Sequence, residues 1–255
     1  MTIARNKRSS GRTFVGTCGF AQSQARLFRD FDILEVQHTF YQPPKVTTAE
    51  RWRQKAPRGF VFTLKAWQLV THDASSPTYR RLKEKLSDTE LDRCGSLRWN
   101  DTTRWAWERT CEIAEALQAT AILLQMPRSF GPTRENLRRL YRFCEVIDRG
   151  GRHIVFEPRG EGWDDDLLRR LASELDLIHA VDPFLRQPVN GPLRYFRLHG
   201  RPAYHYNYRY TPEDLTALQS QLNRQATNYV LFNNTSMADD ARRFRELLRL
   251  GADVS

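Results

Sequence analysis

The chain has 255 residues, of which 40% are hydrophobic and 27% are charged. These proportions are typical of a globular protein with a sizeable core, and no segment has the roughly 20 consecutive apolar residues that span a membrane. The first residues are polar and basic and do not form the apolar core of a signal peptide, so we expect a cytoplasmic protein that does not contact a membrane.

The formal net charge is +10, from 40 Lys and Arg against 30 Asp and Glu. A basic chain favours anionic partners, so we expect an anionic small molecule or a nucleic acid, although a generally basic surface without a specific partner would give the same number. The four cysteines are scattered, with no C-x-x-C pair, and they predict neither a zinc knuckle nor a disulfide framework. They are Cys18, Cys94, Cys111 and Cys144.

Eight short apolar stretches predict strands, because most of them alternate in polarity and are rich in branched or aromatic residues. These strands cover residues 14–18, 33–37, 60–65, 121–127, 153–159, 177–182, 195–200 and 229–234. Helical patterns lie between most of them, at residues 22–31, 48–55, 77–86, 103–117, 133–147, 164–175, 211–225 and 238–250. The alternation predicts a single (β/α)8 TIM-like barrel over residues 12–255, after a disordered basic start over residues 1–11.

Two connections depart from this pattern. Residues 66–118, after the third strand, form a long excursion, within which a hairpin-like segment begins near residue 94 and a segment rich in Trp and Cys covers residues 94–107. Between the sixth and seventh strands, three prolines leave no room for a full helix, so we expect an irregular crossover. They are Pro183, Pro188 and Pro192.

The predicted seventh strand has an unusual polar face. Tyr195, Arg197 and His199 lie on one side, and Phe196 and Leu198 lie on the other. Burial of a guanidinium costs several kcal/mol unless the charge is paired, so an ordinary core face would not carry it. This face therefore predicts a polar site that holds a cation and a titratable base; the alternative is an edge strand with a solvated face.

The other predicted strands carry polar residues in the same phase near their carboxyl ends. The strand-end set is Glu35, Gln37, Thr63, Lys65, Gln125, Glu157, Arg159, Asp182, Arg197, His199 and Asn233. In a barrel these ends line the mouth where active sites lie. Each buried polar group must be paired, which costs stability. The presence of so many polar residues in the same phase therefore indicates a functional pocket more than a role in stability.

Several members have a plain structural alternative. Glu35 could hold Lys65 or Arg197 in place without taking part in chemistry, and Asp182 could form a turn before Pro183. The pair His72 and Asp73 in the long excursion could be solvated. Alternation points two other histidines, His38 and His179, away from the mouth, so we exclude them.

The ordered motifs resemble the YecE-like family of TIM barrels, catalogued as a domain of unknown function. The motifs run through nearly the whole chain: Gly16-Thr17-Cys18-Gly19-Phe20, Glu35-Val36, Thr39-Phe40-Tyr41, Phe62-Thr63-Leu64-Lys65-Ala66, Thr71-His72, Leu124-Gln125-Met126-Pro127, Phe156-Glu157-Pro158-Arg159, Arg197-Leu198-His199-Gly200 and Phe232-Asn233-Asn234. The chain departs from the family where Gln37-His38 replaces Asn-Ser and Cys18 replaces Ser. The resemblance implies the barrel but no activity.

The first functional hypothesis is a hydrolase for a phosphate-containing substrate, with nucleic acid among the candidates, in which arginines hold the anion and carboxylates act as acid and base. The expected catalytic residues are Glu35, Lys65, Glu157, Asp182 and His199. The expected substrate-binding residues are Gln37, His72, Gln125, Arg159, Arg197, Tyr206 and Asn233. A divalent metal ion on the carboxylates is an open option, although no compact motif such as H-x-x-x-H is present. Aromatic and basic residues that could stack on bases are Trp99, Trp105, Tyr204, Tyr206, Tyr208 and Arg209.

Two other functions stay open. One is a metal-free enzyme for a small sugar-like or carboxylate substrate, in which Lys65 forms a Schiff base or donates a proton and Glu157 is the base. The other is a non-catalytic protein whose pocket captures an anion. We expect an enzyme ahead of a binding protein.

Overall fold

The computed structural model describes residues 11–189, 191 and 193–252. The expected disordered start lies outside the described residues except for Gly11, whose N–H donates a hydrogen bond to the carbonyl of Arg224 at 2.8 Å. No helix among the described residues has both the length and the apolar character that crossing a membrane requires.

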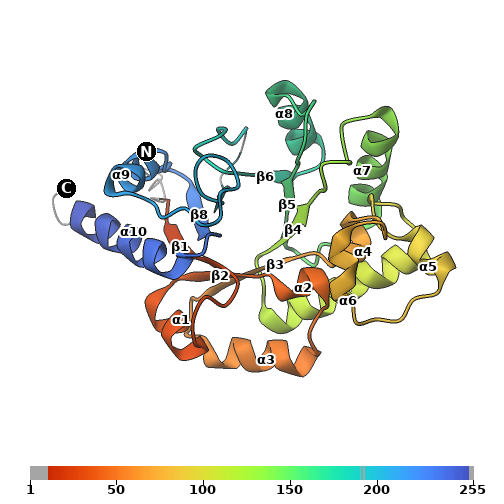
Figure 1. Ribbon diagram of the computed structural model, residues 1–255, viewed down its shortest axis with the longest axis horizontal. Helices are drawn as coiled ribbons and strands as arrows, with labels where there is room; N and C mark the ends of the chain where they lie inside the picture. Colours follow the sequence, from red (N-terminus) through yellow and green to blue (C-terminus); the bar gives the residue numbers. More distant parts are fainter. Residues whose placement is uncertain (1–10, 190, 192, 253–255) are drawn as a thin grey trace, which may run out of the picture.

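Eight parallel strands close into a barrel, as the sequence predicts (Figure 1). Each strand pairs with its neighbours in sequence, and β8 closes the ring on β1. The strands are β1 (Thr13–Cys18), β2 (Ile33–Val36), β3 (Val61–Lys65), β4 (Ala121–Gln125), β5 (His153–Glu157), β6 (Leu177–Val181), β7 (Leu193–Leu198) and β8 (Thr227–Phe232).

Alternation along the strands separates two apolar clusters. One fills the barrel and includes Ile33, Leu123 and Val155, and the other lies between the strands and the surrounding helices. Strands β1 and β2 approach closely at Gly16, where a Cβ atom would lie 1.7 Å from the carbonyl oxygen of Ile33. Only glycine fits there, because any side chain would push the two strands apart.

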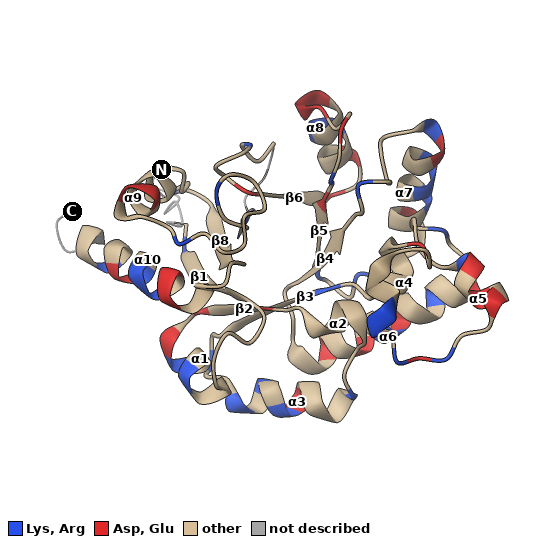
Figure 2. Cartoon of the chain, in the orientation of Figure 1, with Lys and Arg blue, Asp and Glu red and all other residues tan. Residues whose placement is uncertain are grey.

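The helices surround the barrel (Figure 1). They are α1 (Gln24–Asp30), α2 (His38–Tyr41), α3 (Val46–Lys55), α4 (Gln68–Thr71), α5 (Asp88–Arg93), α6 (Asp101–Leu117), α7 (Arg134–Val146), α8 (Asp165–Glu174), α9 (Pro212–Ser220) and α10 (Met237–Ala252), with a 3-10 helix η1 (Pro77–Arg81). Acidic and basic segments alternate along α7 and α10 (Figure 2).

The long excursion after β3 differs from the prediction at residues 77–86. Only η1 is helical there, and it ends at Arg81. The amide oxygen of Gln42 accepts the N–H groups of Lys83 and Glu84, at 3.1 and 3.2 Å, in a segment that is not helical. A helix to residue 86 would need those donors for its own carbonyls.

The expected hairpin near residue 94 is also wrong, because α5 ends there and the chain turns sharply. Gly95 has a left-handed φ of 81°, and its N–H donates to the carbonyl of Leu69 at 2.7 Å. A Cβ atom on Gly95 would lie 2.3 Å from the carbonyl carbon of His72. The segment therefore packs directly on the end of α4.

The crossover between β6 and β7 is irregular, as expected from its prolines. The residues described between Val181 and Leu193 form no helix. Pro192 itself lies outside the described residues. The chain turns at Asp182, whose carbonyl accepts the N–H groups of Leu185 and Arg186, so that the turn folds back beside β6.

Candidate functional site

Arg197 of β7 lies at the centre of the strand-end set. Its Nε and Nη2 atoms donate to the two carboxylate oxygens of Glu35, at 3.0 and 2.8 Å, and Nη1 donates to Oε2 of Glu157 at 2.5 Å. The Arg197 residue is only 1% exposed. Burial opposes its charge, but Glu157 and Glu35 outweigh burial and raise the pKa of Arg197 well above its ordinary value.

Glu35 is enclosed by hydrogen-bond donors. The Tyr195 hydroxyl donates to Oε2 at 2.9 Å, and the side-chain amide of Gln37 donates to Oε1 at 3.1 Å. The Tyr195 hydroxyl also lies 2.8 Å from the hydroxyl of Thr63. Together with the two bonds from Arg197, these contacts occupy both carboxylate oxygens. Of the two roles that the sequence allows, the geometry favours the one in which Glu35 holds Arg197.

Lys65 ends β3 beside this network but has no carboxylate partner among the described residues. Its ammonium donates to Oε1 of Gln125 at 2.7 Å and lies 3.9 Å from the ring centroid of Phe40. Gln125 in turn donates to Oε2 of Glu157 at 2.7 Å. Burial, followed by the charge of Arg197, lowers the pKa of Lys65 from 10.5 to about 7.

His199 is buried against two guanidinium groups. Its Nε2 lies 3.2 Å from Nη1 of Arg197 and 3.5 Å from Nη2 of Arg159. Burial and then Arg197 lower the pKa of His199 to about 3, so the ring is neutral at physiological pH. Because Nε2 faces donors, the proton of the neutral ring belongs on Nδ1, which has no hydrogen-bond partner among the described residues.

Asp182 follows β6 and faces His199. Its Oδ2 accepts the backbone N–H of His199 at 3.2 Å, and its Oδ1 accepts that of Phe184 at 3.1 Å. Burial raises the pKa of Asp182 to about 6 even though both N–H groups favour the carboxylate. The residue forms the turn that the sequence allowed, and it also presents a group that titrates near neutral pH.

Two cavities meet at this side of the barrel. The smaller has a volume of about 130 Å³ and is lined by Glu157, Pro158, His179, Ala180, Val181, Asp182, Leu185, Arg186, His199 and Tyr204. The larger has about 730 Å³ and is lined by Arg128, Ser129, Gly131, Thr133, Pro158, Arg159, Gly160, Glu161 and Tyr204. Pro158 and Tyr204 line both, so the cavities adjoin.

His179 of β6 lines the smaller cavity although strand alternation directs it outward. It lies between Ile178 and Ala180, which face the barrel interior, so its side chain is on the outer side as expected. It is nevertheless buried and lines the smaller cavity, because the turn after β6 covers it. Alternation tells which side of a sheet a residue occupies, but it does not tell which loop folds over that side. The outward direction predicted for His179 is confirmed, although the residue lines the smaller cavity.

The excursion residue His72 does not form a pair with Asp73. Nδ1 of His72 lies 2.8 Å from the Thr71 hydroxyl, and its ring meets Phe40 edge-on at 4.8 Å. Asp73 instead accepts hydrogen bonds from Ser96 and Arg98, at 2.9 and 2.7 Å. His72 thus packs beneath Lys65 through Phe40, whereas Asp73 anchors the chain after α5.

Asn233 and Tyr206 lie at the margin of the site. The backbone N–H of Asn233 donates to the carbonyl of Leu198 at 2.8 Å, which continues the pairing of β7 and β8. Tyr206 is 42% exposed, and its ring centroid lies 6.0 Å from that of His199. Tyr204 is closer to His199, at 5.3 Å, and the guanidinium of Arg159 lies 4.7 Å above its ring.

Of the two tryptophans expected to stack on bases, Trp99 and Trp105, the first packs against a helix, as does Trp107. Trp99 and Trp107 pack edge-on against Phe143 of α7, at 5.8 and 5.2 Å between ring centroids. Trp105 packs on Trp67 at 5.0 Å. Trp99 thus packs on α7, whereas Trp105 is 39% exposed.

The described residues do not fit a divalent metal ion. No three His, Cys, Asp or Glu groups among them are arranged to hold one. The oxygens of Glu35 and Glu157 that would be the natural ligands instead accept hydrogen bonds from Arg197. We therefore assign no step to a metal.

Comparison with known families identifies the fold family. The family described as "Protein of unknown function DUF72" matches residues 17–254. The chain belongs to this family. YecE-like proteins are the same family, so the resemblance seen in the sequence is confirmed. No curated protein matches the chain significantly.

Solved structures show the same fold. A DUF72 family protein (EF0366) from Enterococcus faecalis V583 has a TM-score of 0.73 and 18% identity, with 95% of this chain and 99% of that chain covered. Another (TM1631) from Thermotoga maritima MSB8 has a TM-score of 0.65 and 21% identity, with 93% and 99% covered. A D-psicose 3-epimerase has a TM-score of 0.56 and 14% identity, with 91% and 93% covered. At these identities the likeness shows the fold alone.

The lowered pKa of Lys65 predicts how stability depends on pH. A lysine with a depressed pKa binds its proton less in the folded than in the unfolded protein, so stability rises with pH between about 7 and 10.5. We expect the free energy of unfolding to gain roughly 1 kcal/mol per pH unit from Lys65 between about pH 7 and 8.5. Urea unfolding of the wild type and of Lys65→Met measures this difference in slope.

The exposed lysine Lys85 provides the matched control. Lys85→Met should keep the wild-type slope, since Lys85 lies in solvent. A Lys65→Met variant with the same pH slope as the wild type would show that Lys65 keeps an ordinary pKa.

Proposed function

We propose that the chain is a hydrolase for phosphate esters, which acts where the two cavities adjoin. The observation that supports this proposal is that acid–base residues line one cavity and arginines line the other. The smaller cavity is lined by the acid–base residues Asp182, His199 and Glu157, and the larger by the guanidinium groups of Arg128 and Arg159.

Arg159 and Arg128 are the groups suited to the phosphate. Arg197 is not, because its donors are directed to Glu35 and Glu157. Arg159 donates one bond to Glu157, at 3.2 Å, and its Nε has no partner among the described residues. The side chain of Arg128 forms no ion pair within the described part of the chain. Guanidinium forks match phosphate oxygens, so two such groups at one cavity favour an anion there.

A close contact between two loops brings these arginines together. Gly160 has a left-handed φ of 94°, and a Cβ atom there would lie 2.8 Å from the carbonyl oxygen of Arg128. Gly162 likewise allows Pro132 to approach, with a Cβ atom 3.1 Å from its ring. The loops after β4 and β5 therefore pack tightly, and one arginine comes from each.

Asp182 is the proposed general base. Its Oδ2 lies 3.9 Å from Nδ1 of His199, so one water beside the two atoms would contact both. In the proposed reaction the Nδ1–H of His199 donates to this water, and Asp182 takes a proton from it. The water oxygen bonds to phosphorus while the bond from phosphorus to the ester oxygen breaks. The departing alkoxide takes a proton from solvent, and Arg159 and Arg128 bind the phosphoryl oxygens.

This mechanism predicts the pH dependence of hydrolysis. Asp182 must be ionised to act as a base, so kcat should rise with pH through about 6. Asp182→Asn should lower kcat by about 10²- to 10⁴-fold on a small phosphate ester that the wild type hydrolyses. A panel of nitrophenyl phosphate mono- and diesters, assayed across pH, measures both.

Asp176, whose side chain is 91% exposed, provides the control. Asp176→Asn should keep the wild-type rate and pH profile. Wild-type activity that survives unchanged in Asp182→Asn would contradict the role of Asp182. Binding of phosphate without turnover of any ester would favour the anion-binding protein instead.

A second candidate function rests on Lys65. A buried amine that contacts a neutral amide and an aromatic ring is a nucleophile near neutral pH, as in enzymes that form Schiff bases with carbonyl compounds. The substrate would be a small sugar-like or carboxylate compound with a carbonyl group. The amine nitrogen would bond to the carbonyl carbon, water would leave, and an imine would remain.

Borohydride trapping tests this candidate. Incubation with small aldehydes, ketones and keto acids, followed by reduction, should convert the imine on Lys65 to a stable secondary amine that peptide mass spectrometry detects. Lys65→Met should lose the label and Lys85→Met should retain it. Label confined to exposed lysines would exclude the Schiff base and leave the phosphate hydrolase untouched.

A further inference from the structure

A groove of about 850 Å³ lies beside α2 and the segment after η1. It is lined by His38, Tyr41, Gln42, Pro43, Pro44, Lys45, Trp52, Arg80, Arg81, Leu82, Lys83 and Glu84. The carbonyl of Tyr41 accepts the Nε1–H of Trp67 at 3.3 Å and the side-chain amide of Gln68 at 3.0 Å. Because these two residues follow Lys65 by two and three positions, the groove is fixed to the carboxyl end of β3.

The cations of the groove are not neutralised by the protein. Lys45, Arg80, Arg81 and Lys83 form no ion pair among residues 11–252 as described, and Glu84 is the single carboxylate in the lining. Four positive charges against one negative charge leave a local excess. Such an excess attracts a polyanion, since each neutralised phosphate releases counterions.

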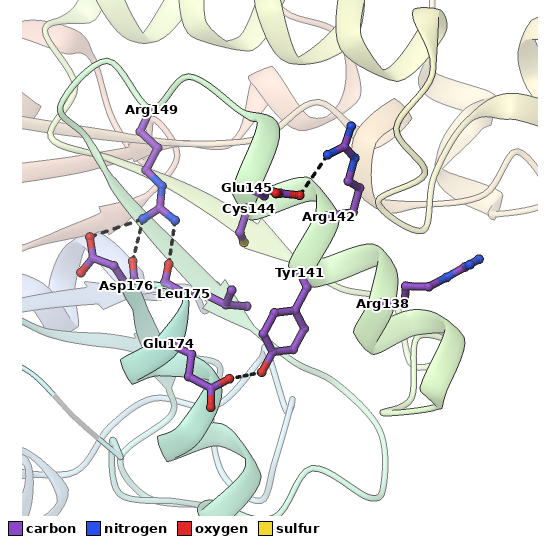
Figure 3. A pocket seen from close by; sticks show the side chains of 9 residues that line it. All are labelled: Arg138, Tyr141, Arg142, Cys144, Glu145, Arg149, Glu174, Leu175 and Asp176. Atoms are coloured by element: carbon purple, nitrogen blue, oxygen red, sulfur yellow. Dashed lines mark hydrogen bonds and ion pairs between the residues drawn. The ribbon is translucent and has the colours of Figure 1, made fainter.

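Another arginine-rich cavity shows what a neutralised surface looks like. Between α7 and α8, a cavity of about 780 Å³ contains Arg138, Arg142 and Arg149 (Figure 3). Each forms an ion pair with a carboxylate: Arg138 with Glu135 at 2.8 Å, Arg142 with Glu145 at 2.9 Å, and Arg149 with Asp176 at 3.4 Å. Arginine content alone therefore does not distinguish the groove; its unpaired charge does.

Aromatic rings lie among these cations. Tyr41 carries the guanidinium of Arg81 at 3.5 Å from its ring centroid, and Trp52 lies 4.9 Å from Phe20. Both rings are half-buried. Aromatic rings interleaved with unpaired cations are the arrangement that binds unpaired bases and a phosphodiester backbone together.

We propose that this groove binds single-stranded nucleic acid. This inference deepens the proposed function, because it names the polymer whose phosphate esters the hydrolase would act on. Any cleavage of that polymer rests on the proposed hydrolase. A duplex is a poorer fit, since its bases are stacked inside and cannot meet Tyr41 or Trp52. The groove is a different surface from the one around Trp99 and Trp105, which the sequence had suggested for base stacking.

Fluorescence anisotropy with labelled oligothymidylate and oligouridylate tests binding without any catalysis. The double variant Arg80→Gln and Lys83→Gln removes two cations, so the slope of log K against log salt should fall by about 1.4. Affinity should then be about 25-fold weaker at about 0.1 M salt and converge with the wild type near 1 M. The matched control, Arg138→Gln with Arg142→Gln, removes the same charge from the paired cavity and should keep the wild-type slope.

A second variant separates nucleic acid from polyanions in general. Tyr41→Leu should weaken oligonucleotide binding by about tenfold through lost stacking and leave heparin binding unchanged. Absence of oligonucleotide binding by the wild type, an equal loss in the control, or an equal loss of heparin binding in Tyr41→Leu would each overturn the proposal.

The two proposals can fail separately. Hydrolysis of small esters without oligonucleotide binding would reject the groove and keep the hydrolase. Oligonucleotide binding that responds to the Arg80 and Lys83 variant, without hydrolysis of any ester, would keep the groove as a binding site and reject the hydrolase.

Discussion

The buried charge of Arg197 is the constraint on which the rest of the site depends. Burying a guanidinium and two carboxylates costs several kcal/mol for each ion, and the cost is offset only when the geometry satisfies them all. Glu35 on β2 and Glu157 on β5 satisfy Arg197 from opposite sides, with Tyr195 and Gln37 completing the shell of Glu35. Loss of one partner would leave an uncompensated charge, at a cost of about 3–5 kcal/mol.

This ion network also sets the chemistry of its neighbours. The charge of Arg197 acts with burial to lower the pKa of Lys65 to about 7 and that of His199 to about 3. Asp182 lies farther out, where burial dominates and raises its pKa to about 6. The network around Arg197 thus has three groups at its edge: the neutral imidazole of His199, the amine of Lys65 and the carboxyl group of Asp182. The last two titrate near neutral pH.

The sequence could predict the barrel and the cluster of polar strand ends, because strand alternation puts residues such as Lys65, Glu157 and His199 in one phase at strand ends. It could not assign partners: that Glu35 saturates Arg197 while Lys65 meets only Gln125 depends on side-chain packing across the barrel. The contacts that loops make were the other feature that the sequence could not predict. The turn that buries His179, and the contact of Gln42 with Lys83 that shapes the basic groove, join segments whose proximity no local pattern encodes.

We propose that Arg197 belongs to the framework of the site, whereas Arg159 and Arg128 bind the substrate. The most direct measurement is a crystal structure of the protein with inorganic phosphate. We expect a phosphate ion in the larger cavity, bonded to Arg159 and Arg128, with Arg197 still bonded to Glu35 and Glu157. A phosphate bound by Arg197 after it has left either carboxylate, or no phosphate between Arg159 and Arg128, would contradict these roles.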